Sequence, residues 1–179
     1  MTSSSSPRHR DYDCAQAILT GVLKPHREKE GEWVLCHQRG ILPVGLHQSL
    51  REDLEVSPEK YRQPQRLLCW VRWDWEKSRL SLTVVQPLRQ KESHRDHYNI
   101  RGRVVSVQNT LLLVQVTPAG GVVEPFEIPV VLNPNWKSLP SEGQRVDLIG
   151  HRYQGWLHAR QCHVLKPLLS AQSELVVAS

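Results

Sequence analysis

The sequence has few of the features that mark secreted or membrane-anchored proteins. It contains no apolar run near the roughly 20 residues that span a bilayer, and its first residues, MTSSSSPRHRDYD, are polar where a secretory signal would be apolar. The four cysteines lie far apart and form no CxxC pair, which argues against a disulfide framework and against a zinc ribbon. We therefore expect reduced thiols, no membrane association and a cytoplasmic location.

The common signatures of catalysis are also missing. No HExxH, GxSxG, Walker or GxGxxG motif occurs, and the acidic residues of 49–62 are explained by a solvated helix face. The nine histidines invite a search for metal ligands, and His158, Cys162 and His163 lie within six residues of each other. Cys162 and His163, however, fall on opposite faces of a strand, so the three side chains cannot all bind one ion. We therefore expect a non-catalytic protein without a metal ion or other cofactor.

The overall charge is weakly informative. Lys and Arg outnumber Asp and Glu by 23 to 18, which gives a formal charge of +5 and a pI near 9.2. This excess is compatible with a polyanionic partner, although many proteins that bind no nucleic acid share it.

Polar segments divide the chain. Residues 1–12 read as a flexible, serine-rich tail, and RQKESHRDHYN, residues 89–99, contains no aliphatic residue and indicates a linker, with a long hairpin arm as the alternative. This predicts two modules, residues 13–88 and 100–168, followed by a C-terminal tail of residues 169–179.

The two modules resemble each other. The first ends QRLLCWVRWDWEKSRLSLTVVQPL and the second ends QRVDLIGHRYQGWLHARQCHVLKPL, and the two stretches stay in step with little insertion. LTGVLKP and IRGRVVSVQ open the two halves. A repeat of roughly 80 residues suits duplicated small domains better than a solenoid.

Each half predicts five short strands, because runs of Val, Ile, Leu and Trp are separated by turn residues such as EGE, QRG and YQG. The expected strands cover residues 17–25, 32–37, 40–47, 66–75 and 79–88 in the first half, and 100–108, 110–116, 124–132, 144–153 and 155–165 in the second. One helix is expected in residues 49–62, where Pro58 would break it or start a second short turn. The equivalent span in the second half is too short and proline-rich for a helix.

Five strands with a helix or loop between the third and fourth follow the order of the OB-fold, a small Greek-key barrel. Residues 15–168 thus resemble a tandem pair of OB-folds, and the predicted fold class is all-β with one short helix in the first barrel. SH3-like barrels or one larger sandwich would give similar patterns. The resemblance implies binding of single-stranded DNA or RNA or of oligosaccharides, or a role as a protein–protein adaptor.

The stretch LLCWVRWDWEK, residues 67–77, holds three of the six tryptophans. Side chains on a strand alternate between faces, so Trp73 and Trp75 share the apolar face and are expected in the barrel interior or at its rim. Trp70 falls on the outer face beside Arg72, where it can stack on a base or pack against the other module.

The last predicted strand lacks a clean alternation. One face carries Trp156, His158, Arg160 and Cys162, and the other carries Leu157, Ala159, Gln161 and His163, so a β-bulge would resolve the conflict. If Trp156, His158 and Arg160 point outward, they form an aromatic and basic patch suited to single strands. Otherwise Trp156 is a core residue.

Further basic residues add candidates. Arg101 and Arg103 share one strand face and can contact successive phosphates or one acidic partner. Together with His151, Arg152 and the linker residues Arg89, Lys91, Arg95 and His97, they would line a positive groove between the modules, with a solvated, charged linker as the alternative. Arg8 and Arg10 in the N-terminal tail would add salt-dependent affinity for phosphates, with a disordered end of no consequence as the alternative.

Two functions fit these observations. The first is a non-catalytic protein that binds single-stranded DNA or RNA, as an accessory subunit of a nucleoprotein complex. Its candidate contact residues are Trp70, Arg72, Arg101, Arg103, Arg152, Trp156, His158 and Arg160. The second is a protein–protein interaction adaptor, whose partner buries Trp70 and the apolar C-terminal end ELVVAS, residues 174–179.

Overall fold

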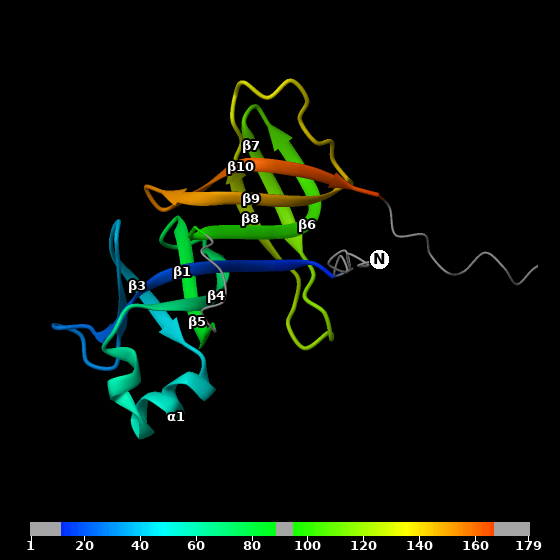
Figure 1. The fold of residues 1–179 in the computed structure, drawn as a ribbon. Helices are drawn as coiled ribbons and strands as arrows, with labels where there is room; N and C mark the ends of the chain where they lie inside the picture. Colours follow the sequence, from blue (N-terminus) through cyan, green and yellow to red (C-terminus); the bar gives the residue numbers. More distant parts are fainter. Residues whose placement is uncertain (1–11, 89–94, 167–179) are drawn as a thin grey trace, which may run out of the picture.

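The structure, a computed structural model, describes residues 12–88 and 95–166 (Figure 1). Almost all of the expected N-terminal tail, the first part of the polar segment 89–99 and the whole C-terminal tail lie outside these residues. In the part of the chain that is described, no helix has the length and apolar character needed to cross a membrane.

Strands dominate the described residues. They are β1 (Cys14–Pro25), β2 (Trp33–His37), β3 (Gly40–Leu46), β4 (Gln65–Asp74), β5 (Arg79–Pro87), β6 (His97–Gln108), β7 (Leu111–Val116), β8 (Phe126–Val131), β9 (Arg145–Tyr153) and β10 (Trp156–Leu165). Each coincides with a strand expected from the sequence, and the ends differ by no more than three residues. The largest differences are at the starts of β1 and β6, so residues 97–99 belong to a strand and not to a linker.

The expected helix is broken where proline predicts a break. Helix α1 spans Gln48–Val56, and a separate 3₁₀ turn, η1, spans Pro58–Tyr61. Proline has no backbone N–H to continue the α-helix, but it is well tolerated at the first position of a new turn. Leu50 and Leu54, four residues apart, and Tyr61 are buried and close one end of the first barrel.

The strand pairings confirm the all-β fold class. β1–β5 close into a barrel in the order β1–β2–β3–β5–β4–β1, and β6–β10 repeat that order as β6–β7–β8–β10–β9–β6. All pairs are antiparallel except β3–β5 and β8–β10, which are parallel. We call these the first and second barrels; they share one strand order, as the two halves of the sequence resemble each other.

The two barrels form one continuous sheet, because β1 and β6 also pair with each other. Their register runs antiparallel from Cys14 opposite Arg101 to Ile18 opposite His97. Figure 1 shows β1 and β6 side by side at the junction of the barrels. This pairing explains why both strands begin earlier than their apolar patterns predicted.

A glycine lies where each first strand serves two neighbours. At Gly21, β1 passes from its pairing with β4 to its pairing with β2, and near Gly102, β6 passes from β9 to β7. A Cβ atom would lie 2.6 Å from the Cys36 carbonyl oxygen at Gly21 and 2.2 Å from the Gln115 carbonyl oxygen at Gly102. Neither site has room for a side chain.

The tryptophan strand is only partly as predicted. Trp73 is in the core, 7% exposed, and Trp70 is on the outer face, 46% exposed, as the alternation indicated. The placement of Trp75 in the core or at its rim is wrong, since this side chain is 60% exposed. β4 ends at Asp74 and the chain turns there, so the alternation stops one residue before Trp75.

The β-bulge expected in the last strand is present. The register between β10 and β9 shifts between Ala159 and Gln161. Leu157 and Ala159 point into the core before the shift, and Cys162 packs against the core after it. The extra residue changes which positions of the strand point inward, and this explains why neither face of the sequence is wholly apolar.

Candidate nucleic-acid interface

Aromatic and basic side chains form a row on the outer face of the β9–β10 hairpin. Because Leu157 and Ala159 point inward, Trp156, His158 and Arg160 point outward. Across the hairpin, Tyr153 lies opposite Trp156 and His151 lies opposite His158. We call these five residues the β10 row; none of them is acidic.

The members of the row contact one another. The His158 ring lies 5.8 Å from the His151 ring and 5.6 Å from the Tyr153 ring, measured between centroids. Arg160 Nε donates a hydrogen bond of 3.0 Å to His151 Nδ1. These contacts hold the guanidinium and three rings in one surface, which reduces the side-chain entropy lost when a ligand binds.

Positive charge surrounds His151 in the row. The pKa of His151 is lowered by burial and then by the neighbouring charges of Arg160, His158 and Arg39. A lowered pKa keeps His151 neutral at pH 7, so its Nδ1 can accept the hydrogen bond from Arg160. Arg39 belongs to the β2–β3 turn of the first barrel, so both barrels contribute positive charge here.

Trp156 connects the row to the first barrel. Its ring packs on Trp73 with 4.6 Å between centroids and an interplanar angle of 49°. The sequence left open whether Trp156 points outward or belongs to the core. In the structure it lies on the outward face of β10 and is also half-buried against the core. Trp73 in turn meets the exposed Trp75 edge-on at 6.2 Å.

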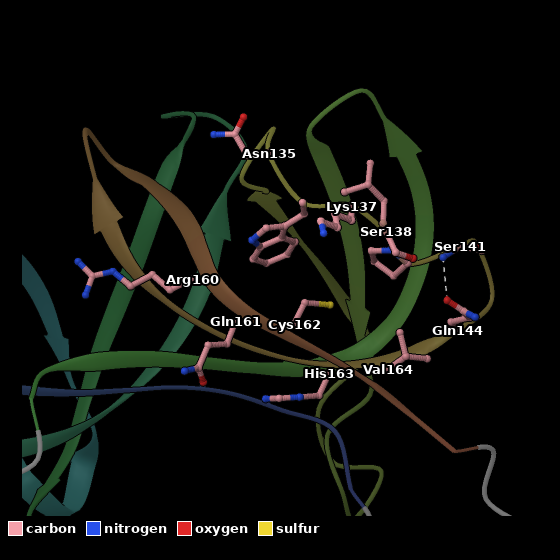
Figure 2. Close-up of a pocket in the computed structure, with 13 residues that line it drawn as sticks. Asn135, Lys137, Ser138, Ser141, Gln144, Arg160, Gln161, Cys162, His163 and Val164 are labelled. Atoms are coloured by element: carbon pink, nitrogen blue, oxygen red, sulfur yellow. Dashed lines mark hydrogen bonds between the residues drawn. The ribbon is translucent and has the colours of Figure 1, made fainter.

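A cleft of about 860 Å³ adjoins the other end of the row, between β10 and the loop of residues 135–141 (Figure 2). Trp136, Lys137, Arg160 and His163 line it, and no acidic residue does. Figure 2 shows Arg160 extending from β10 away from the loop. The loop takes the place between the third and fourth strands that α1 occupies in the first barrel, so this end of the second barrel has no helix to close it.

Two candidate arginines on β6 lie outside the row. Arg101 forms an ion pair of 2.7 Å with Asp147, and both side chains are only 12% exposed. Asn99 donates a further hydrogen bond of 2.7 Å to the same carboxylate. Arg103 is exposed on the same strand. The Asp147 carboxylate offsets the charge of Arg101. Arg101 and Arg103 together therefore attract a phosphate less strongly than two arginines without a nearby carboxylate would.

Arg152 is next to the row in sequence but on another face. It lies opposite the buried Leu157 across the hairpin, and its half-buried side chain carries an Nε atom without a hydrogen-bond partner among the described residues. It lies close to Tyr98, whose pKa is raised by burial, an effect that the Arg152 charge opposes.

Trp70 and Arg72 lie apart from the row on the first barrel. The Trp70 ring packs edge-on against His47 of the same barrel, with 5.1 Å between centroids. Arg72 lies over the Phe126 ring of β8, with its guanidinium carbon 4.6 Å from the centroid. The sequence left open that Trp70 packs against the other module. Arg72 and Trp73 instead make contacts with the second barrel.

Sequence reasoning missed three residues near the row. Tyr153 could have been found, because a tight hairpin turn at YQG places it opposite Trp156. Trp75 was assigned to the wrong environment, since the end of β4 was placed one residue too late. Arg39 carries no sequence signal, because only the docking of the two barrels brings it near His151.

Within residues 12–88 and 95–166, no group of three or more His, Cys, Asp or Glu side chains is placed to hold a metal ion. No protein-family model matches the sequence, and the comparison with curated proteins finds no similar sequence.

Proposed function

We propose that the protein binds single-stranded DNA or RNA through the β10 row, without catalysis, as an accessory subunit of a nucleoprotein complex. The observation that carries the proposal is the row itself: Trp156, Tyr153 and two histidines beside Arg160, on one outward face. Proteins that bind single strands combine aromatic rings, on which bases stack, with cations that follow the phosphates.

Two further features support the proposal. Each half of the described chain is a five-stranded barrel, and OB-folds, which are barrels of five strands, often bind oligonucleotides. The chain also has a formal charge of +5, which favours association with a polyanion.

The test measures binding of a fluorescein-labelled single strand of about 15 nucleotides, within the usual range for OB-folds, as DNA and as RNA. Fluorescence anisotropy is followed between about 50 and about 200 mM salt. Each phosphate contact contributes about 0.7 to the slope of log K against log salt for a single strand. We therefore expect Arg160→Ala to weaken binding and to lower this slope by about 0.7.

Arg103→Ala is the matched control, because it removes an exposed arginine from the same barrel outside the row. It should leave the affinity and the slope close to those of the unmodified protein. Absence of binding at the lowest salt, or equal effects of the two substitutions, would overturn the proposal.

A second function, the protein–protein adaptor, is favoured by the exposure of Trp70. An indole that is 46% exposed on a strand face is of the type found in interfaces. The adaptor hypothesis predicts that the unmodified protein recovers one stoichiometric protein from native extract and that Trp70→Ala does not. Recovery that is unchanged by the substitution excludes Trp70 as the contact.

A further inference from the structure

A pocket of about 250 Å³ lies between the barrels, next to the β10 row. One wall is aromatic and consists of Trp73, Trp75 and Trp156. Leu111, Leu113 and Pro129 of the second barrel also line the pocket. Trp156 belongs both to this pocket and to the row, so the two features are continuous.

Trp75 is held in place but left in solvent. The turn that carries it is fixed by a hydrogen bond of 3.1 Å from the Lys77 backbone N–H to Asp74 Oδ1. The Leu80 N–H also donates a hydrogen bond of 2.9 Å to the Gly155 carbonyl, which ties this turn to the second barrel. The turn positions Trp75 beside Trp73, and its indole stays 60% exposed, so its face is open to stacking without a change of the backbone.

The polar lining selects the chemical class of ligand. Ser78, Ser106 and Gln108 reach the pocket, and none of the residues around it is charged. Hydroxyl and amide groups donate and accept hydrogen bonds, so they can pair with the edge of any base, whereas a phosphate would find no cation inside. The volume is below the roughly 300–1,000 Å³ of pockets for drug-sized ligands, which suits one ring system.

We propose that this pocket holds a single nucleobase of the bound strand, stacked on Trp75, while its phosphates run along the β10 row. The inference rests on the proposed function and names the base subsite of the same interface. Aromatic side chains and a neutral polar lining, continuous through Trp156 with the row that carries Arg160, together favour a nucleotide over an aliphatic peptide side chain.

The first experiment compares Trp75→Ala with Trp70→Ala in the anisotropy assay. Both substitutions remove an exposed tryptophan from the same hairpin, but only Trp75 lines the pocket. Stacking on one aromatic ring predicts about 5- to 140-fold weaker binding for Trp75→Ala and little change for Trp70→Ala. Trp75→Phe should restore most of the affinity, because phenylalanine retains a π-face.

The salt dependence separates the pocket from the row. Trp75→Ala removes no charge, so its slope of log K against log salt should equal that of the unmodified protein, whereas Arg160→Ala lowers it. Thermal unfolding checks that each variant is folded. Equal affinity of the Trp75→Ala and Trp70→Ala variants would overturn the base pocket and leave the row untouched.

The second experiment does not need oligonucleotide binding. Indole N–H resonances are followed by NMR during titration with AMP, and Trp75→Ala identifies the resonance of Trp75. We expect AMP to shift this resonance and to leave that of Trp70 in place. A shift with AMP in a protein that binds no oligonucleotide supports the pocket and refutes the proposed function. N-acetylphenylalaninamide, which carries an aromatic peptide side chain, is titrated in parallel. No shift with AMP, or a shift only with N-acetylphenylalaninamide, overturns the base pocket.

Discussion

The substitution Gly102→Ala should destabilise the protein strongly, because it adds one methyl group where β6 changes partners. The added Cβ would lie 2.2 Å from the Gln115 carbonyl oxygen and 2.8 Å from Val114 Cγ1. Gln115 belongs to the neighbouring strand, so its backbone must move by about 0.8 Å before the first distance reaches 3.0 Å, the lower limit of real Cβ contacts. A shift of this size disrupts the β6–β7 hydrogen bonds nearby.

The expected loss of unfolding free energy is about 3 kcal/mol, since overpacking costs about 1–3 kcal/mol and each lost hydrogen bond adds about 1 kcal/mol. For a chain of this length, the melting temperature should fall by about 6–12 °C. Circular dichroism during heating measures this shift, and urea unfolding gives the free energy independently.

Gly45→Ala is the matched control. At Gly45 the nearest atom to an added Cβ is Thr83 Oγ1 at 3.4 Å, an ordinary contact, so the substitution should change stability by no more than about 1 kcal/mol in either direction. If Gly102→Ala melts within about 2 °C of Gly45→Ala, less than 1 kcal/mol separates them and the close approach of β6 and β7 is refuted.

Two predictions concern protonation. Arg160→Ala should raise the pKa of His151 towards its ordinary value, because it removes both a like charge and the hydrogen bond that favours the neutral ring; histidine NMR titration measures this, and an unchanged pKa contradicts the contact. Asp53→Asn should lower stability only at higher pH, because Tyr61 and then Lys60 hold the pKa of Asp53 below its ordinary value by hydrogen bonding. The stability difference from the unmodified protein should be complete above the ordinary carboxyl pKa and vanish as the pH falls through the lowered one; urea unfolding at several pH values measures it, and a difference that persists at low pH contradicts the assignment.

The sequence by itself determined the elements of this fold. Period-two alternation and turn residues placed all ten strands of the described residues, since both signals are local. Pro58 marked the end of α1 because the missing N–H is a property of the residue alone. The two conflicting faces of β10 indicated a bulge, and the alternation in β4 placed Trp73 inside and Trp70 outside.

The tertiary structure decided what the surface residues do. The pairing of β1 with β6 joined the barrels, and no local pattern reveals which distant edges will pair. That docking brought Arg39 towards His151 and closed a pocket beside Trp75, whereas Asp147 on β9 neutralised Arg101 on β6. Solvent-facing positions tolerate many side chains, so their sequence carries little information about neighbours that are far along the chain. Trp75 is exposed because β4 ends at Asp74, one residue earlier than expected. Alternation alone does not define where a strand ends.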